Sequence, residues 1–190
     1  KMAAHVTHEI RNPLSAISLN LDLLESEIED EGRDPKEQRE LVGAIKAEAN
    51  RLSRLSEQYL SLARRPAPAL VTESLGELVE EILASIKPEL SRAQVEVALT
   101  IEPEVPDVPF DENLLRQAIV NLIRNAREAM TEGGHLWLAV GKAERAVELA
   151  IEDDGPGIPE EVRVHVFDPF FTTKQRGTGL ELAVTREIVE

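Results

Sequence analysis

Two long stretches near the start of the chain place apolar residues along one line of a helix. At about 100° per residue, the apolar positions of the first stretch fall within about 40° of one line; they are Ile10, Leu14, Ile17, Leu21, Leu24 and Ile28. After a Gly- and Pro-containing turn at residues 32–35, a second stretch advances in alternating steps of four and three through Leu41, Ile45, Glu48, Leu52, Leu55, Tyr59 and Leu62. This spacing predicts two helices, each with one apolar stripe.

The two predicted helices set an expectation for assembly. An isolated hairpin does not bury both stripes well, whereas two hairpins bury them together in a four-helix bundle. We therefore expect a homodimer, with an ordinary hairpin docked on the rest of the chain as the alternative. Because Pro66 and Pro68 favour an extended connector, we expect a hairpin domain over residues 1–65, a linker over 66–70 and a second domain over 71–190.

Beyond the linker the pattern becomes mixed. It predicts strands near 70–74, 95–101, 136–140 and 146–152, helices over 75–90 and 111–130, and a last helix after residues 177–180. Helices and strands in this alternation pack as two layers. The expected fold class is therefore an α+β multidomain protein, in which a helical hairpin forms a dimeric four-helix bundle and is followed by an α/β sandwich.

Composition narrows the class of protein. The chain has 190 residues, 42% of them hydrophobic, which suits one or two domains. Its net charge of -15 argues against nucleic acid, and the absence of cysteine excludes disulfides and thiolate metal sites. No run of apolar residues reaches membrane-spanning length, so we expect a cytoplasmic chain without direct membrane contact. We also expect a fragment, because it begins inside a predicted helix and ends inside another; attachment of a longer protein to a membrane stays open.

The first helix presents a histidine away from its apolar stripe. His8 lies about 160° from the stripe, and Asn12, four residues on, shares its outward face. Alone, such a histidine is usually a surface residue, but Glu9 adjoins it and Pro13 is expected to bend the helix. HVTHEIRNPLSAI closely resembles the H-box of sensor histidine kinases. The resemblance implies that His8 accepts the γ-phosphoryl group of ATP and that Glu9 is its base. Asn12 then orients water for dephosphorylating a partner, or is only structural.

Two asparagines share a face of the long helix over 111–130. Asn121 and Asn125 are four residues apart, and an Asn carbonyl oxygen is a hard ligand of the kind that Mg²⁺ accepts. Simple surface polarity is the alternative for such a pair. NLIRNAREAM closely resembles the N-box of the same family, which implies that Asn125 is the leading Mg²⁺ ligand and that Asn121 supports the phosphates.

An acidic, glycine-rich turn follows the last predicted strand. A carboxylate held there is able to accept a hydrogen bond from the exocyclic amine of adenine, although a tight acidic turn would also explain it. DDGPGI resembles the G1 box, which implies that Asp153 reads adenine and that Gly155 and Gly157 shape the turn. Asp154 replaces the usual Asn, and we expect it to matter less.

Two further segments resemble the F-box with the start of the ATP lid, and the G2 box. FDPFFTTK holds three of the four phenylalanines, and its resemblance implies nucleotide contacts from Phe170 and Thr173, with Lys174 reaching the triphosphate. Free amides at a helix start bind phosphates. The G2-like residues are Gly177, Thr178, Gly179 and Leu180. About 20 residues separate the G1 and G2 glycines, so the lid should be short, as in the nitrogen-regulation type.

Glu181 is the sharpest departure, because the G2 pattern GTGLGLA has glycine there. Two like charges about 6 Å apart repel by roughly 2 to 3 kcal/mol at a dielectric constant of about 20. A Glu181 carboxylate that faces the triphosphate would therefore weaken ATP binding about a hundredfold. Pointing outward, it would cost far less.

Together these motifs resemble the catalytic core of a sensor histidine kinase. The resemblance implies a homodimer that uses ATP and Mg²⁺ to phosphorylate His8 and passes the phosphoryl group to an aspartate of a response regulator receiver domain, with regulator phosphatase activity in addition. The first alternative is a signalling scaffold or regulator phosphatase with a nucleotide site impaired by Glu181. The second is an ATPase of the related chaperone and mismatch-repair (GHKL) type.

Overall fold

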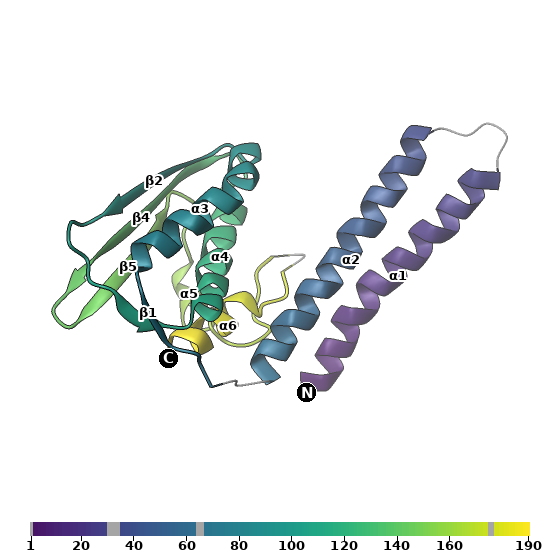
Figure 1. Cartoon of the computed structure of the whole chain (residues 1–190). Helices are drawn as coiled ribbons and strands as arrows, with labels where there is room; N and C mark the ends of the chain where they lie inside the picture. Colours follow the sequence, from purple (N-terminus) through teal and green to yellow (C-terminus); the bar gives the residue numbers. More distant parts are fainter. Residues whose placement is uncertain (1, 30–34, 64–66, 175–176) are drawn as a thin grey trace. The chain divides into compact units, whose positions relative to one another are not determined.

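The computed structural model describes residues 2–29, 35–63, 67–174 and 177–190. The chain divides into two compact units, residues Lys1–Arg64 and Arg65–Glu190. The first unit is a helical hairpin of α1 (Met2–Glu29) and α2 (Pro35–Ala63), as Figure 1 shows. Helix α1 continues without interruption through Pro13. None of the described helices has the length and apolar character that a membrane span requires.

The apolar stripe of α1 is only partly covered within the hairpin. Ile10 is 40% exposed, Leu14 51%, Leu21 44% and Ile28 51%, while Ile17 and Leu24 are half-buried. On α2 the stripe residues Leu41, Ile45, Glu48 and Leu52 are half-buried, whereas the side chains of Leu55, Tyr59 and Leu62 lie outside the described part. The hairpin therefore leaves a line of apolar surface along α1.

The second unit contains all the elements that the sequence predicts there and two that it does not. In chain order they are β1 (Val71–Glu73), α3 (Leu75–Arg92), β2 (Val95–Ile101), β3 (Val108–Phe110), α4 (Glu112–Ala129), β4 (Gly134–Ala143), β5 (Ala146–Asp153), α5 (Glu160–Arg163) and α6 (Glu181–Val189). Strand β3 was missed because its three residues include a proline, which sequence patterns count against strands. Helix α5 is one turn and shows no periodicity.

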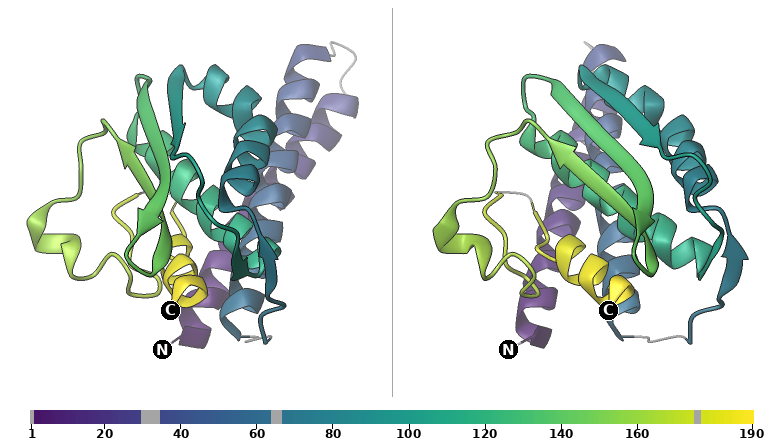
Figure 2. Two further views of the ribbon diagram at one scale, coloured as in Figure 1. Left: turned by 60° about the vertical axis from the view of Figure 1, so that its left-hand side comes forward. Right: turned by 90° about the vertical axis from the view of Figure 1, so that its left-hand side faces the viewer.

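The strands form one three-stranded and one two-stranded sheet. In the larger sheet β4 is central; it pairs in parallel with β2, from Val95 opposite Gly134 onward, and antiparallel with β5. Strand β1 pairs antiparallel with β3. Figure 2 shows α3 and α4 on one side of the larger sheet. These two layers are the predicted α/β sandwich, so the expected fold class, a hairpin followed by this sandwich, is confirmed.

The core lies between the larger sheet and the two long helices. Alternate residues of β4 are fully buried against it, namely Leu136, Leu138 and Val140, together with Ile82 of α3 and Ile119 and Ile123 of α4. Asp111 caps α4: one carboxylate oxygen accepts the Leu114 N–H at 3.1 Å and the other accepts the Ala69 N–H at 2.8 Å. These hydrogen bonds lower the pKa of Asp111. The cap therefore fixes the start of the helix that carries both asparagines.

Candidate functional site

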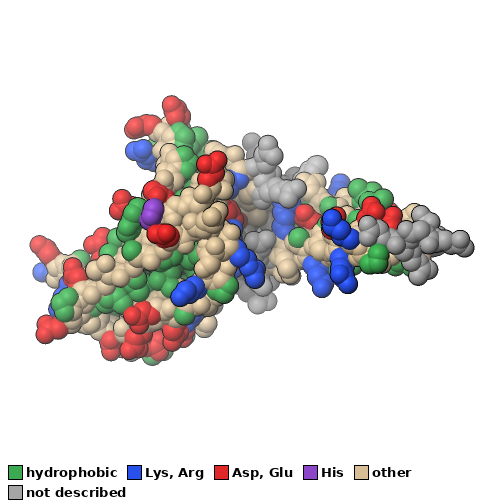
Figure 3. Space-filling view, turned by 90° about the horizontal axis from the view of Figure 1, so that it is seen from above, with side chains coloured by type: hydrophobic (Ala, Val, Ile, Leu, Met, Phe, Trp, Pro, Cys, Tyr) green, Lys and Arg blue, Asp and Glu red, His purple; other side chains and the backbone are tan. Residues whose placement is uncertain are grey.

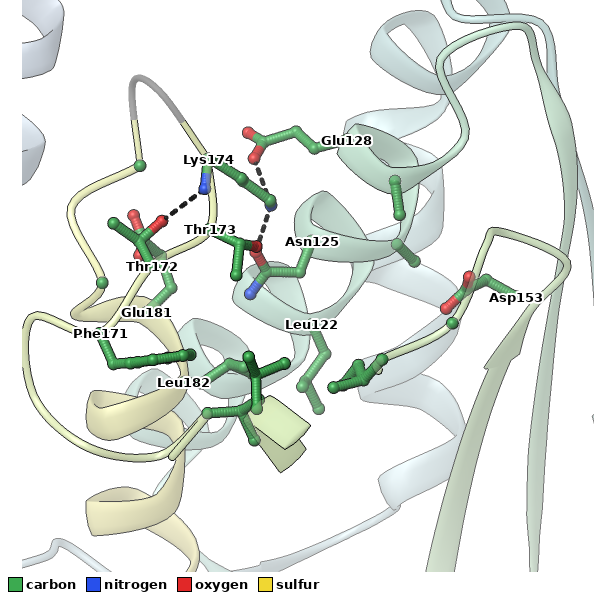
Figure 4. Close-up of a pocket in the computed structure, with 18 of the residues that line it drawn as sticks. Leu122, Asn125, Glu128, Asp153, Phe171, Thr172, Thr173, Lys174, Glu181 and Leu182 are labelled. Carbon is green, nitrogen blue, oxygen red and sulfur yellow. Dashed lines mark hydrogen bonds and ion pairs between the residues drawn. The ribbon is translucent and has the colours of Figure 1, made fainter. Parts of the chain in front are cut away.

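A cavity of about 730 Å³ opens within the second unit. Its walls come from the second half of α4, the inner face of β5, the loop after β5, the segment 171–174 and the start of α6 (Figure 4). Apolar walls are supplied by residues such as Leu122, Leu149, Ile151, Ile158 and Phe171. This volume lies within the range of small-molecule sites in proteins, and a mostly apolar lining with few polar groups is typical of them.

One end of the cavity holds a polar cluster on α4. The Lys174 ammonium donates to Asn125 Oδ1 at 2.9 Å and to Glu128 Oε2 at 2.7 Å (Figure 4). Asn125 Nδ2 is buried and has no hydrogen-bond partner among the described residues. A buried amide donor without a partner is costly, so this end of the cavity is suited to a ligand that supplies an acceptor.

Asn121 takes a different place from Asn125. Its amide Nδ2 approaches the backbone carbonyl of Glu181 at 3.5 Å, and it is not among the residues that line the cavity. Asn121 thus ties α4 to the first residue of α6. The two asparagines share a helix face, as their spacing predicts, but only Asn125 reaches the cavity.

Asp153 lies across the cavity from Lys174 and Glu181 (Figure 4). One carboxylate oxygen accepts the Gly155 N–H at 3.0 Å, which holds the side chain at the end of β5. Asp153 lines the cavity, and a carboxylate is able to accept more than one hydrogen bond. The cavity is therefore polar at both ends, and its apolar wall lies between them.

Asp154, the neighbour of Asp153, ties this loop to β4. Its carboxylate accepts the backbone N–H of His135 at 2.8 Å and lies 2.9 Å from His135 Nδ1. The backbone hydrogen bond and then the ring lower the pKa of Asp154, while the carboxylate raises the pKa of His135. Asp154 therefore has a structural contact that the sequence did not reveal.

The start of α6 brings Glu181 to the cavity wall. Its half-buried carboxylate accepts a hydrogen bond from Thr178 Oγ1 at 2.7 Å. Gly179, just before it, has a φ of +64°, and a Cβ there would lie 2.5 Å from the Phe170 carbonyl carbon. Glycine is therefore required at this turn. Glu181 is thus one of the residues that line the cavity, and Thr178 holds its carboxylate.

The cavity gathers some of the predicted site residues and leaves others beside it. The predicted residues among its lining are Asn125, Asp153, Gly157, Thr173, Lys174, Gly177 and Gly179. Those outside the lining are Asn121, Gly155, Phe170, Thr178 and Leu180. Glu128 also lines the cavity, although no sequence motif singled it out; its spacing of three from Asn125 places both on one helix face.

The acceptor motif lies in the other unit. His8 and Glu9 belong to α1, but their side chains are outside the described part, whereas Asn12 is exposed on that helix. The described residues contain no group of three His, Cys, Asp or Glu side chains suited to a metal.

Both units match known protein families. Residues 1–68 match the model of the His Kinase A (phospho-acceptor) domain, and residues 110–190 match that of the histidine kinase-, DNA gyrase B-, and HSP90-like ATPase. The solved catalytic domain of the histidine kinase ThkA is 31% identical over 63% of this chain and 79% of that chain, with a TM-score of 0.59. The chain belongs to the histidine kinases.

Relatives of this histidine kinase core match it along its length. Sporulation kinase A of Bacillus subtilis (strain 168) is 33% identical over 100% of this chain and 30% of its own length. Sensor histidine kinase ZraS of Escherichia coli (strain K12) is 31% identical over 100% of this chain and 40% of its own. The chain thus spans well under half of these relatives. ThkA solved in complex with the response regulator protein TrrA matches 100% of this chain and 54% of that chain, at 28% identity and a TM-score of 0.81.

Proposed function

We propose that this chain is the kinase core of a two-component sensor, which uses ATP to phosphorylate His8 and passes the phosphoryl group to an aspartate of a response regulator receiver domain. The observation that carries this proposal is the cavity, in which Asn125, Asp153 and Lys174 from three separate motifs line one space. Because the chain spans only part of its relatives, the proposal concerns this core.

The lining of the cavity supports one orientation of ATP. Asp153 at one end would accept the adenine amine, and the apolar wall would contact the base. The phosphates would then lie towards Lys174 and the start of α6, where backbone amides and the ammonium favour anions. Asn121 would support this end by holding α6 against α4, since its amide approaches Glu181 O.

The donor set at the phosphate end is suited to Mg²⁺. Asn125 Oδ1 and Glu128 Oε2 are hard oxygen ligands that now share the Lys174 ammonium. We propose Asn125 as the protein ligand, with Glu128 beside it. The bound cation would neutralise charge on the triphosphate, and Lys174, released from the two oxygens, would contact the phosphates as a second positive charge.

In the transfer step, the residues that react with the nucleotide belong to the first helix. A ring nitrogen of His8 would attack the γ-phosphorus while the bond to the β-phosphate oxygen breaks and ADP leaves. Glu9 would take the ring proton, which keeps the nitrogen nucleophilic. Transfer to the regulator's aspartate restores His8. Asn12, exposed on the same helix, would orient water for dephosphorylating the regulator.

Assembly and organisation complete the proposal. The exposed stripe of α1 supports a homodimeric four-helix bundle, since a second hairpin would cover it. We propose the boundaries 1–65, 66–70 and 71–190, with Pro66 and Pro68 favouring an extended connector between the two domains. We also propose a short lid of the nitrogen-regulation type and a cytoplasmic location.

Glu181 supports a second candidate, a scaffold or regulator phosphatase with weakened ATP binding. Its carboxylate is half-buried in the cavity wall, where a triphosphate would meet a like charge. A GHKL-type ATPase without phosphotransfer is the third candidate, against which the hairpin with its H-box argues.

Incubation of the chain with γ-labelled ATP and Mg²⁺ distinguishes the three candidates. The kinase predicts a protein-bound label that is labile in acid and stable in base. Phosphate released without labelled protein would instead indicate an ATPase. If neither appears while nucleotide binding is weak, the scaffold or phosphatase replaces the kinase.

A further inference from the structure

The outer face of the three-stranded sheet carries one tryptophan, and several of its neighbours on that face have small side chains. The strand register places Ala98 and Glu152 on either side of Trp137, and in the next row Thr100 and Ala150 flank Ala139. All of these residues are exposed, and Trp137 is 42% exposed. The residues between them on β4 are buried, so this face is the one turned away from the core.

Carboxylates surround this small apolar area. Glu96 lies beside His135 at one end of the face, and Glu148 is opposite Gly141 at the other. The Glu102 carboxylate lies over Gly141, because a Cβ at that glycine would meet its Cδ at 2.9 Å. Alternate positions along this face of the described strands, over 96–102, 135–141 and 148–152, include no Lys or Arg. Figure 3 shows hydrophobic side chains gathered on this unit, with many acidic and a few basic side chains around them.

We propose that this surface, the Trp137 face, binds a basic amphipathic segment of a partner protein. The His135 ring stacks on Trp137 with centroids 5.6 Å apart and lies 3.5 Å from Glu96, so the partner would meet the uncovered side of the indole. The face consists of Trp137, Ala98, Ala139 and Ala150 with His135, Glu96, Glu148 and Glu152 at its margin. An aliphatic or aromatic side chain of the partner would pack beside Trp137, because the alanines let it approach the sheet closely. Tryptophan is enriched among the residues that dominate binding energy. Lys or Arg side chains of the partner would meet the marginal carboxylates, which steer and align it.

Charge favours this occupant over others. A second copy of the chain would bring the same carboxylates against the face and be repelled, as would nucleic acid or an anionic membrane. The face is also separate from the nucleotide cavity. Leu149 and Ile151 of β5 line the cavity, whereas Ala150 and Glu152 alternate with them on the outer side. The proposal therefore does not depend on nucleotide binding.

The chain offers a direct probe, because Trp137 is its single tryptophan. A synthetic peptide with Leu and Lys at amphipathic helical spacing is titrated into the full chain while Trp137 emission and its quenching by acrylamide are recorded. We expect a saturable blue shift and a loss of quenching with one peptide per chain. The same peptide with Glu in place of Lys should cause neither change.

Matched variants distinguish the face from general attraction to an acidic protein. Glu148→Gln with Glu152→Gln should weaken peptide binding about tenfold. Glu80→Gln with Asp107→Asn, which removes the same charge from exposed sites on α3 and before β3, should leave it unchanged. Trp137→Phe, followed by calorimetry, should also weaken binding, and circular dichroism checks that each variant is folded.

Two results would overturn the proposal. Equal weakening by both double variants would mean that the peptide follows net charge and not the face. Poor acrylamide quenching before peptide is added would mean that a second copy or another part of the chain already covers Trp137.

Discussion

The two units of this chain bury their apolar residues in different ways. In the second unit Leu78 of α3 is 4% exposed and belongs to a core closed within one chain. In the hairpin Leu21 of α1, at the same kind of helical position, is 44% exposed. The second unit thus buries its core residues within one chain, whereas the hairpin has an apolar stripe that a second hairpin would cover. We therefore expect the stability of the second unit to depend on its core and the stability of the hairpin to depend on assembly.

The largest effect is expected from a substitution in the closed core of the second unit. Leu78→Ala should lower the free energy of unfolding of the nucleotide unit by about 2 to 5 kcal/mol, because it leaves a cavity in a closed core. Chemical unfolding followed by Trp137 fluorescence measures this, since that residue lies in β4. An effect below about 1 kcal/mol would contradict the closed core.

The matched change Leu21→Ala should act on assembly instead. Two copies in a dimer would together lose about 3 kcal/mol of apolar burial, which raises the dissociation constant of the dimer roughly a hundredfold. Sedimentation over a range of concentrations measures this constant. An unchanged constant would show that α1 is not the dimer interface.

The charge on the cavity wall gives the next effect. Glu181→Gly should tighten Mg²⁺-ATP binding by up to about a hundredfold if the carboxylate faces the phosphates. Glu181→Gln separates the charge from the loss of the side chain, and Glu187→Gln, exposed on the same helix, is the matched control. Calorimetric titration measures these affinities. Equal affinities of the wild type and both Glu181 variants for Mg²⁺-ATP would contradict the hypothesis that Glu181 weakens nucleotide binding.

A smaller effect is expected from Lys174, at the end of the cavity where the phosphates would lie. Lys174→Met should weaken ATP binding about tenfold, because it removes one positive charge that would lie beside the triphosphate. The same variant should weaken AMP binding much less, since adenine would be bound by Asp153 at the opposite end of the cavity. Competition binding with the two nucleotides measures the difference, and equal losses would place Lys174 away from the phosphates.

The smallest effect concerns pH and the pair that joins β4 to the G1-like turn. The pKa of His135 is raised by Asp154, with Glu96 also near it, so its contribution to stability is full below about pH 6.5 and is lost as the pH rises through the raised pKa. The pKa of Asp154 is lowered, so its contribution is present above about pH 4 and is lost in acid. Thermal melts should therefore show a stabilising effect of His135 over His135→Gln at pH 6 that shrinks at pH 8.5. An effect that grows with pH would contradict the pairing.

Periodicity and motif order predicted most of the fold and part of the site. The stripes of both helices, the strands of the larger sheet and the long helix α4 follow from local spacing, because spacing is a local property. The contacts of Asn121 with Glu181, of Glu128 with Lys174 and of Asp154 with His135 join residues that are far apart in the chain. No pattern within a segment encodes them. Strand β3 was missed because it has only three residues and one of them is a proline, so that only its pairing with β1 defines it as a strand.

The most direct test of the account compares two variants in parallel, one from each unit. His8→Ala should bind Mg²⁺-ATP with unchanged affinity and take up no label from γ-labelled ATP, whereas Asp153→Ala should lose both binding and label. This result would assign the acceptor to the hairpin and the donor to the cavity. Acid-labile label on the His8→Ala chain, or full labelling of Asp153→Ala, would contradict the account.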